Sequence, residues 1–202
     1  MPELYICTSI EVDGPIPGPH SMLSLASAAY DTRQQLVSLF SINLQPLKKA
    51  QAHPDTLAHW KSMPEAWAVV THEPETPHRA MLEYIDWLDH LPAQKVLVAY
   101  PAARAFAFIE YYLFKFAGRS PFHKSALDLK SFAMAMLHRP YFQTKKRHMP
   151  DAWLFDSPPH TYVALDDAIA VGRLLGHMLD SRATLPRIQS LPDENLPGLI
   201  DP

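Results

Sequence analysis

Three strand-like segments joined by short connections open the chain, and they constrain its fold more than any other feature. Residues 4–10, 22–30 and 35–44 combine apolar alternation with β-branched and aromatic side chains. A Gly/Pro-rich turn at 14–19 follows the first segment, and a polar turn at 31–34 joins the other two. Consecutive strands with such short connections pair antiparallel, so the sequence predicts an antiparallel three-strand meander.

Helix and strand patterns alternate after the meander. Two short helices at 53–61 and 64–70 each carry a proline near their start, where a missing N–H costs little. Further helices are predicted at 76–91, 101–116, 130–138 and 163–182, with strands at 94–100 and 125–129 and a basic, aromatic loop at 142–159. This order predicts an α/β fold, a mixed sheet that combines the antiparallel meander with parallel strands and is flanked by helices.

Length and composition predict one globular domain with an appended tail. Of 202 residues, 48% are hydrophobic, which suits a single core over residues 1–182. Residues 183–202 are rich in proline and are predicted to be an extended C-terminal tail. No apolar run reaches the roughly 18 residues of a membrane span, and no secretory signal is recognisable. The single cysteine, Cys7, excludes an intrachain disulfide and favours a cytoplasmic location.

Positive charge is concentrated in one segment, although the formal net charge of the chain is −3. Between residues 115 and 148 a single acidic residue, Asp128, accompanies eight basic ones: Lys115, Arg119, Lys124, Lys130, Arg139, Lys145, Lys146 and Arg147. Such a segment predicts a surface for an anion, with polyphosphate the obvious candidate. The alternative is an ordinary solvated face whose charges pair with acids elsewhere in the fold.

A polar pair interrupts the first strand. Ser9 and Glu11 are two residues apart, so their side chains point to the same face of the strand. In a buried strand, such polar groups are either satisfied by structural hydrogen bonds or belong to a functional site.

Three motifs in order suggest which site this is. They are Ser9-Ile-Glu-Val-Asp-Gly14, Val98-Ala-Tyr-Pro-Ala-Ala-Arg-Ala-Phe106 and His160-Thr-Tyr-Val-Ala-Leu-Asp-Asp-Ala168. Together they resemble the three exonuclease motifs of the DEDDh 3′–5′ exonucleases, which include proofreading exonucleases and oligoribonuclease. The likeness covers roughly residues 4–180 and implies a ribonuclease H-like fold.

The resemblance implies two-metal hydrolysis of a phosphodiester, with Mg²⁺ or Mn²⁺ held by carboxylates and a histidine as general base. Glu11 matches the family's first-motif glutamate, and Asp167 matches its last aspartate. The family's other three positions fall at Ser9, Ala105 and Tyr162, where the required side chains are absent. The resemblance therefore implies a degenerate active site in which Glu11 and Asp167 hold at most one weakly bound cation.

Neighbouring residues are poor replacements for the missing groups. His160 is seven residues before Asp167 rather than five, and Glu110 lies about 140° round the helix from Ala105. Asp166 faces about 100° away from Asp167, and Asp13 lies at a turn. Arg104 brings a positive charge close to the expected metal position unless its side chain points outward.

Basic and aromatic side chains near the motifs are candidates for contacts with nucleic acid. Lys145, Lys146 and Arg147 are expected to bind nucleic-acid phosphates. Tyr162 either fills the space of the family's histidine, the favoured reading, or stacks on a base. Either stacking on unpaired bases or burial in the core is expected for Phe142, Trp153 and Phe155. Packing inside the protein is expected for Trp60, Trp67 and Trp87.

Three functions remain open from the sequence. The first is a pseudoenzyme that keeps the exonuclease fold and binds single-stranded nucleic acid, a nucleotide or another phosphate ligand. The second is an active 3′–5′ exonuclease with non-standard ligands, which requires Mg²⁺ or Mn²⁺; no other cofactor is expected. The third is a dimerisation or scaffold module, for which a homodimer is the natural partner arrangement.

Overall fold

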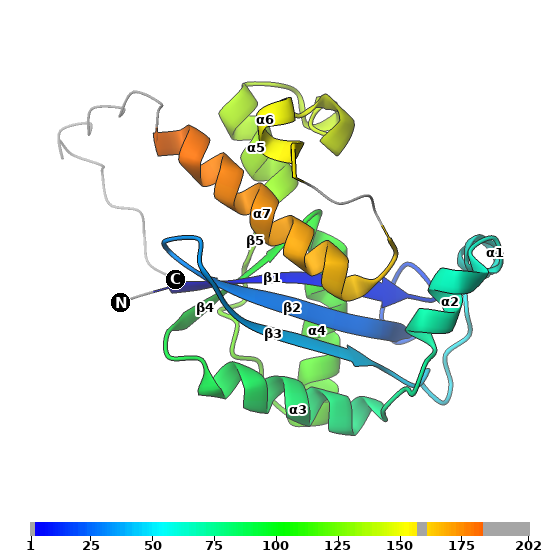
Figure 1. The fold of residues 1–202 in the computed structure, drawn as a ribbon. Helices are drawn as coiled ribbons and strands as arrows, with labels where there is room; N and C mark the ends of the chain where they lie inside the picture. The colour runs from blue at the N-terminus through cyan, green and yellow to red at the C-terminus, as the bar shows by residue number, and fades with distance from the viewer. Residues whose placement is uncertain (1–2, 157–160, 184–202) are drawn as a thin grey trace, which may run out of the picture.

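The computed structural model describes residues 3–156 and 161–183, and within them one mixed sheet organises the chain (Figure 1). Its strand order is β3-β2-β1-β4-β5. β1 pairs antiparallel with β2 and parallel with β4, which confirms the predicted meander and parallel strands. The strands are β1 (Glu3–Val12), β2 (Met22–Asp31), β3 (Leu36–Asn43), β4 (Gln94–Ala99) and β5 (Ala126–Asp128).

Helices cover both faces of the sheet. α3 (Pro77–His90) and α4 (Ala102–Ala117) pack on one face, and α7 (Ala164–Ala183) crosses the other, with α5 (Leu129–Leu137) beyond it (Figure 1). The alternation of β1 divides its side chains between these layers. Ile6 and Ile10 join the core against α3 and α4, whereas Cys7 joins the core against α7. Ser9 and Glu11 share the parity of Cys7 and therefore face the α7 side.

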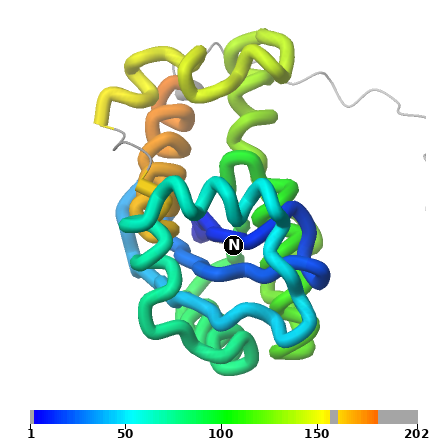
Figure 2. Tube along the Cα trace, turned by 90° about the vertical axis from the view of Figure 1, so that its right-hand side faces the viewer, coloured from blue at the N-terminus to red at the C-terminus, as the bar shows by residue number. Residues whose placement is uncertain are grey.

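Two short helices close the end of the sheet at which β1 terminates. α1 (Pro54–Lys61) and α2 (Pro64–Val70) lie across this end, where they face the viewer in Figure 2. Trp60 is 3% exposed, and its Nε1–H donates to the carbonyl oxygen of Val12 at 3.0 Å. The expected packing of the tryptophans is confirmed, since Trp67 contacts Trp60 and Trp87 stacks on Tyr84.

The prediction of a loop at 142–159 was wrong over much of its length. The 3₁₀ helices η1 (Tyr141–Gln143) and η2 (Lys146–His148) and the one-turn helix α6 (Asp151–Leu154) occupy this segment. Pro140 and Pro150 are the N-cap residues of η1 and α6, with ψ of 144° and 141°. Residues 157–160, which include His160, and residues 184–202 of the predicted tail lie outside the described residues, whereas Ala183, the first residue of that prediction, ends α7.

Of the helices in the described ranges, none combines the length and apolar character needed to cross a bilayer.

Substitution of Tyr112 tests how α4 fixes the start of β2. The Tyr112 hydroxyl oxygen accepts a hydrogen bond from the backbone N–H of Met22 at 2.7 Å, in the fully buried core. Tyr112→Phe leaves that N–H without this acceptor, so we expect a loss of about 1–3 kcal/mol in the free energy of unfolding. Urea denaturation measures the loss. Tyr111→Phe is the matched control, because the Tyr111 hydroxyl accepts a hydrogen bond from the exposed Lys115 rather than from a buried backbone N–H. Equal stability of the two variants would contradict the assignment.

Candidate functional site

A pocket of about 300 Å³ lies beside the carboxyl-terminal half of β1. Residues from β1, α1, the start of α4, η2 and the start of α7 line it. The structure brings together in this one pocket all the positions singled out from the exonuclease motifs, which are Ser9, Glu11, Ala105, Tyr162 and Asp167. These residues are far apart in the sequence, so the fold alone makes them neighbours.

Each pocket position follows from local structure. Ser9 and Glu11 reach the pocket because strand alternation turns them towards α7. Ala105 stands in the first turn of α4, where it is 6% exposed. Asp167 lies in the first turn of α7 and is 8% exposed, with its backbone N–H bonded to the Val163 carbonyl oxygen at 3.2 Å.

Burial and like charge disfavour ionisation of Glu11. Its surroundings raise its pKa from 4.5 to about 8, mainly because burial penalises the charged carboxylate and secondly because of the negative charge of Asp167. The positive charge of Arg104 acts in the opposite direction and lowers the pKa of Glu11. The raised pKa favours the protonated form of Glu11, which can donate a hydrogen bond.

Two cationic side chains face the pocket. Arg104 lines it, although its residue is exposed overall, so its side chain does not simply point outward. Lys146 also lines it, with its Nζ 5.6 Å from the centroid of the Tyr100 ring. The two residues that flank Lys146, namely Lys145 and Arg147, are exposed outside the pocket lining. The structure thus separates the three residues predicted to bind phosphate.

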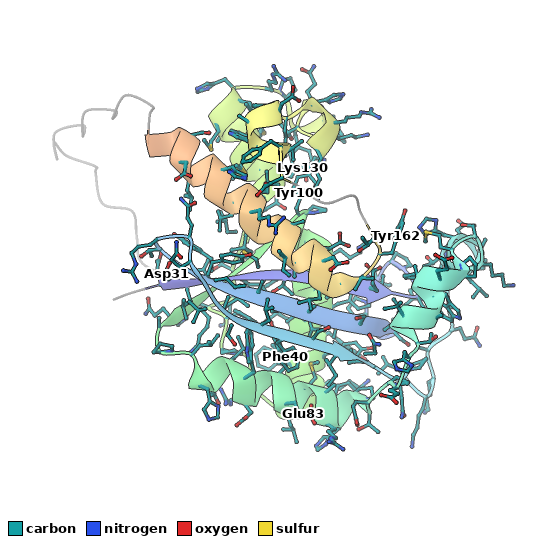
Figure 3. The ribbon with its side chains drawn as sticks, viewed as in Figure 1. Asp31, Phe40, Glu83, Tyr100, Lys130 and Tyr162 are labelled. Carbon is teal, nitrogen blue, oxygen red and sulfur yellow. The ribbon has the colours of Figure 1, made fainter. Side chains whose placement is uncertain are left out.

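An aromatic wall forms the side of the pocket next to α1. Tyr162, with a positive φ of 58°, lies between the start of α7 and the α1–α2 pair (Figure 3). Its ring centroid is 5.4 Å from that of His59 and 6.4 Å from that of Trp60. Sequence reasoning missed His59 as a pocket residue. It lies far in sequence from the motifs, and no residue spacing links it to them.

Of the other aromatic residues with two interpretations, one lies in the core and two lie on the surface. Trp153 is 4% exposed and its Nε1–H donates to the Ser181 hydroxyl at 2.7 Å, so it belongs to the core and is unavailable for stacking on a base. Phe142 and Phe155 are 78% and 75% exposed. Neither is a core residue.

The pocket residues do not fit a pair of divalent cations. Such a pair needs a set of oxygen ligands, mostly carboxylates, around both ions. Among the described residues no group of three or more His, Cys, Asp or Glu side chains is arranged to hold a metal ion. Within the pocket lining, Glu11 and Asp167 supply the carboxylates.

The nearby acids serve other purposes. Glu110 accepts a hydrogen bond from the Ser120 hydroxyl. Asp166 accepts one from Thr161 at 2.9 Å, and Asp13 accepts one from the Ser21 backbone N–H at 2.5 Å. None of the three lines the pocket.

No protein-family model matches the chain. It is 28% identical over 154 residues to the 3′-5′ DNA exonuclease Cap18 of Escherichia coli, a match that covers 71% of this chain and 74% of Cap18. The chain is related to the DEDDh exonucleases. This relationship and the mixed sheet with its flanking helices confirm the predicted ribonuclease H-like fold.

Solved structures of exonucleases share the fold of this chain. The nuclease domain of 3′hExo, a DEDDh family member bound to rAMP, superposes with a TM-score of 0.64 at 15% identity, over 89% of this chain and 92% of that one. Exonuclease I of E. coli in complex with a dA16 oligonucleotide gives a TM-score of 0.62 at 12% identity, over 89% of this chain and 41% of that one.

A Glu11→Gln variant tests the electrostatics of the pocket. The folded chain keeps a proton on Glu11 between pH 4.5 and about 8 that the unfolded chain releases. The free energy of unfolding should therefore fall as pH rises through this window, by up to about 1.4 kcal/mol per pH unit for one proton. Glu11→Gln stays neutral, so urea denaturation between pH 5 and pH 8 should show a flatter profile.

The exposed Glu65 on α2 provides the control for this measurement, because Glu65→Gln should keep the wild-type pH profile. Identical profiles for the wild type and Glu11→Gln would show that Glu11 ionises as readily in the folded chain as in the unfolded one.

Proposed function

We propose that the pocket binds the terminal nucleotide of single-stranded nucleic acid and that the chain has lost two-metal phosphodiester hydrolysis. The observation that carries this proposal is the composition of the pocket. All five positions matched to the exonuclease motifs meet there, but only Glu11 and Asp167 among them are acidic. Two cationic side chains, Arg104 and Lys146, face the same space.

The proposed binding mode uses the charges and rings of the pocket. Arg104 and Lys146 donate to a phosphate group, and the protonated Glu11 donates a further hydrogen bond. Tyr162 and His59 offer an aromatic wall against which a base or sugar packs. Lys145 and Arg147, outside the pocket, contact adjacent phosphates. The structural relatives support this mode, because 3′hExo was solved with rAMP and exonuclease I with single-stranded DNA.

The loss of hydrolysis follows from the ligands. In a two-metal site the cations activate water and stabilise the leaving oxygen. Here a hydroxyl at Ser9 and a methyl group at Ala105 stand in two of the positions matched to family carboxylates. Arg104 adds a positive charge that opposes cation binding. A pocket with this balance of charge favours a phosphate over a pair of metal ions.

One observation favours a second function, an active exonuclease with non-standard groups. His59 stands in the pocket wall beside Tyr162, the position matched to the family's histidine. An imidazole there is a candidate general base. This alternative predicts Mg²⁺- or Mn²⁺-dependent release of nucleotides from a single-stranded oligonucleotide, with activity that disappears in His59→Ala. The scaffold alternative predicts no binding of nucleic acid at all.

Reversion of the substituted positions tests the loss of hydrolysis. We expect no nuclease activity from the wild type on an end-labelled dT oligonucleotide with Mg²⁺ or Mn²⁺. We expect activity from Ser9→Asp combined with Ala105→Asp and Tyr162→His, because each missing group commonly costs about 10²–10⁴-fold. Histidine tolerates the positive φ at position 162. Wild-type activity that vanishes in both Glu11→Ala and Asp167→Ala would overturn the proposal, and adding Glu11→Ala to the triple variant should abolish the gain.

Salt dependence tests the role of the cationic side chains. Each phosphate contact to a single strand contributes about 0.7 to the slope of log affinity against log salt concentration. Lys146→Ala should weaken binding of a fluorescent dT oligonucleotide and reduce the magnitude of this slope by about 0.7, the contribution of one phosphate contact. Lys145→Ala and Arg147→Ala should each have a similar effect. Lys95, near the start of β4 and away from the pocket lining, is the control. An effect of Lys95→Ala as large as that of Lys146→Ala would contradict a specific role.

A further inference from the structure

An exposed aromatic pair stands beside a lysine at the edge of the α5 layer. In η1 the rings of Tyr141 and Phe142 meet edge to face, with centroids 5.7 Å apart and planes at 79°. The Nζ of Lys130 lies 3.8 Å from the Tyr141 ring centroid and 5.5 Å from that of Phe142. Phe142 is 78% exposed, so its ring presents an open face. Lys130, Tyr141 and Phe142 together form the η1 platform.

Carboxylates do not neutralise the basic segment around this platform. Arg119 pairs with Asp89. The other seven basic residues between 115 and 148 form no ion pair with a carboxylate among the described residues. The alternative raised by the sequence, a solvated face whose charges pair with acids elsewhere, therefore explains only Arg119. An uncompensated basic surface attracts polyanions.

The η1 platform and the pocket lie on either side of the start of α4. A second hollow of about 350 Å³ is lined by Tyr141, Lys124 and the first residues of α4. Pro101 lines the pocket, and the next residue, Ala102, lines the second hollow. Tyr100, which lines the pocket, donates from its hydroxyl to the Thr144 carbonyl oxygen at 3.0 Å, which ties the pocket to the segment that carries the platform. Figure 3 labels Tyr100 and, at the start of α5, Lys130.

The acid in the second hollow does not oppose an anion there strongly. Both carboxylate oxygens of Asp128 accept backbone N–H groups at 2.6 Å, one from Ala102 and one from Ser131. Asp128 caps α5, where the helix N-terminus compensates its negative charge. The exposed Lys124 stands on the same hollow.

We propose that single-stranded nucleic acid whose terminal nucleotide occupies the pocket continues over the start of α4 to the η1 platform. There an unpaired base stacks on Phe142, and the adjoining phosphate binds Lys130. This inference rests on the proposed function and adds an extension subsite to it. An exposed aromatic ring beside uncompensated lysines suits a strand with free base faces, because stacking is tolerant of sequence and each phosphate meets a cation.

Binding measured against strand length tests the subsite. The probes are dT2, which fills only the pocket, and dT8, which extends beyond it; each competes with a labelled dT8 in fluorescence anisotropy. We expect the wild type to bind dT8 more tightly than dT2. Phe142→Ala should weaken dT8 binding by about 5- to 100-fold, the range for loss of one base–aromatic stack, and leave dT2 binding unchanged. Phe142→Trp should retain tight dT8 binding.

Matched controls exist within the chain. Phe155 is 75% exposed and packs on His177 of α7, so Phe155→Ala removes an equally exposed ring outside the platform. Lys115 makes a similar contact with the Tyr111 ring, 4.9 Å from its centroid, near the other end of α4. Lys130→Gln should therefore weaken dT8 binding, whereas Lys115→Gln and Phe155→Ala should not.

The outcomes separate the two proposals. If the wild type binds dT2 and dT8 equally, or if Phe142→Ala acts no more strongly than Phe155→Ala, the subsite is overturned and the pocket proposal stands. Equal weakening of dT2 and dT8 by Phe142→Ala also overturns the subsite. If the wild type binds neither oligonucleotide, the proposed function fails and the subsite fails with it.

Discussion

Two carboxyl groups that share one partly buried pocket set the chemistry of this protein. Strand alternation in β1 aims Glu11 at the pocket, and the first turn of α7 brings Asp167 to the same place. Burial and the nearby charge of Asp167 oppose the ionisation of Glu11 and raise its pKa to about 8. A two-metal enzyme offsets such a cost with bound cations. This chain instead has fewer carboxylates and faces the pocket with Arg104 and Lys146.

The remaining architecture is consistent with the proposed binding of an anion in the pocket. The core against α3 and α4 anchors one face of β1, and α7 lies over the other, so the pocket walls are rigid elements. The Trp60–Val12 hydrogen bond places α1, and with it the aromatic wall, at the end of β1. Lys146 of the basic segment lines the pocket, and Lys130 stands in the η1 platform beyond the start of α4. In the proposed function, the pocket at this end of the sheet binds phosphate on an exonuclease-like fold.

Much of this arrangement could be predicted from the sequence. Apolar alternation placed Ser9 and Glu11 on one face, and the motif order identified positions that the fold does bring together. The helical turns of 142–159 were not predictable, because prolines and basic residues there resemble a loop in periodicity. Trp153 was ambiguous, since its burial depends on packing against α7. His59 became a pocket residue only through the tertiary placement of α1, for which no local pattern exists.

A crystal structure of the chain with Mn²⁺ and a short dT oligonucleotide tests the central claim most directly. The account predicts an intact strand, with its terminal nucleotide beside Tyr162 and a phosphate bound by Arg104 and Lys146. It also predicts that anomalous scattering reveals no pair of ions. Two Mn²⁺ ions roughly 3.5–4 Å apart between Glu11 and Asp167, or a cleaved terminal nucleotide, would contradict it.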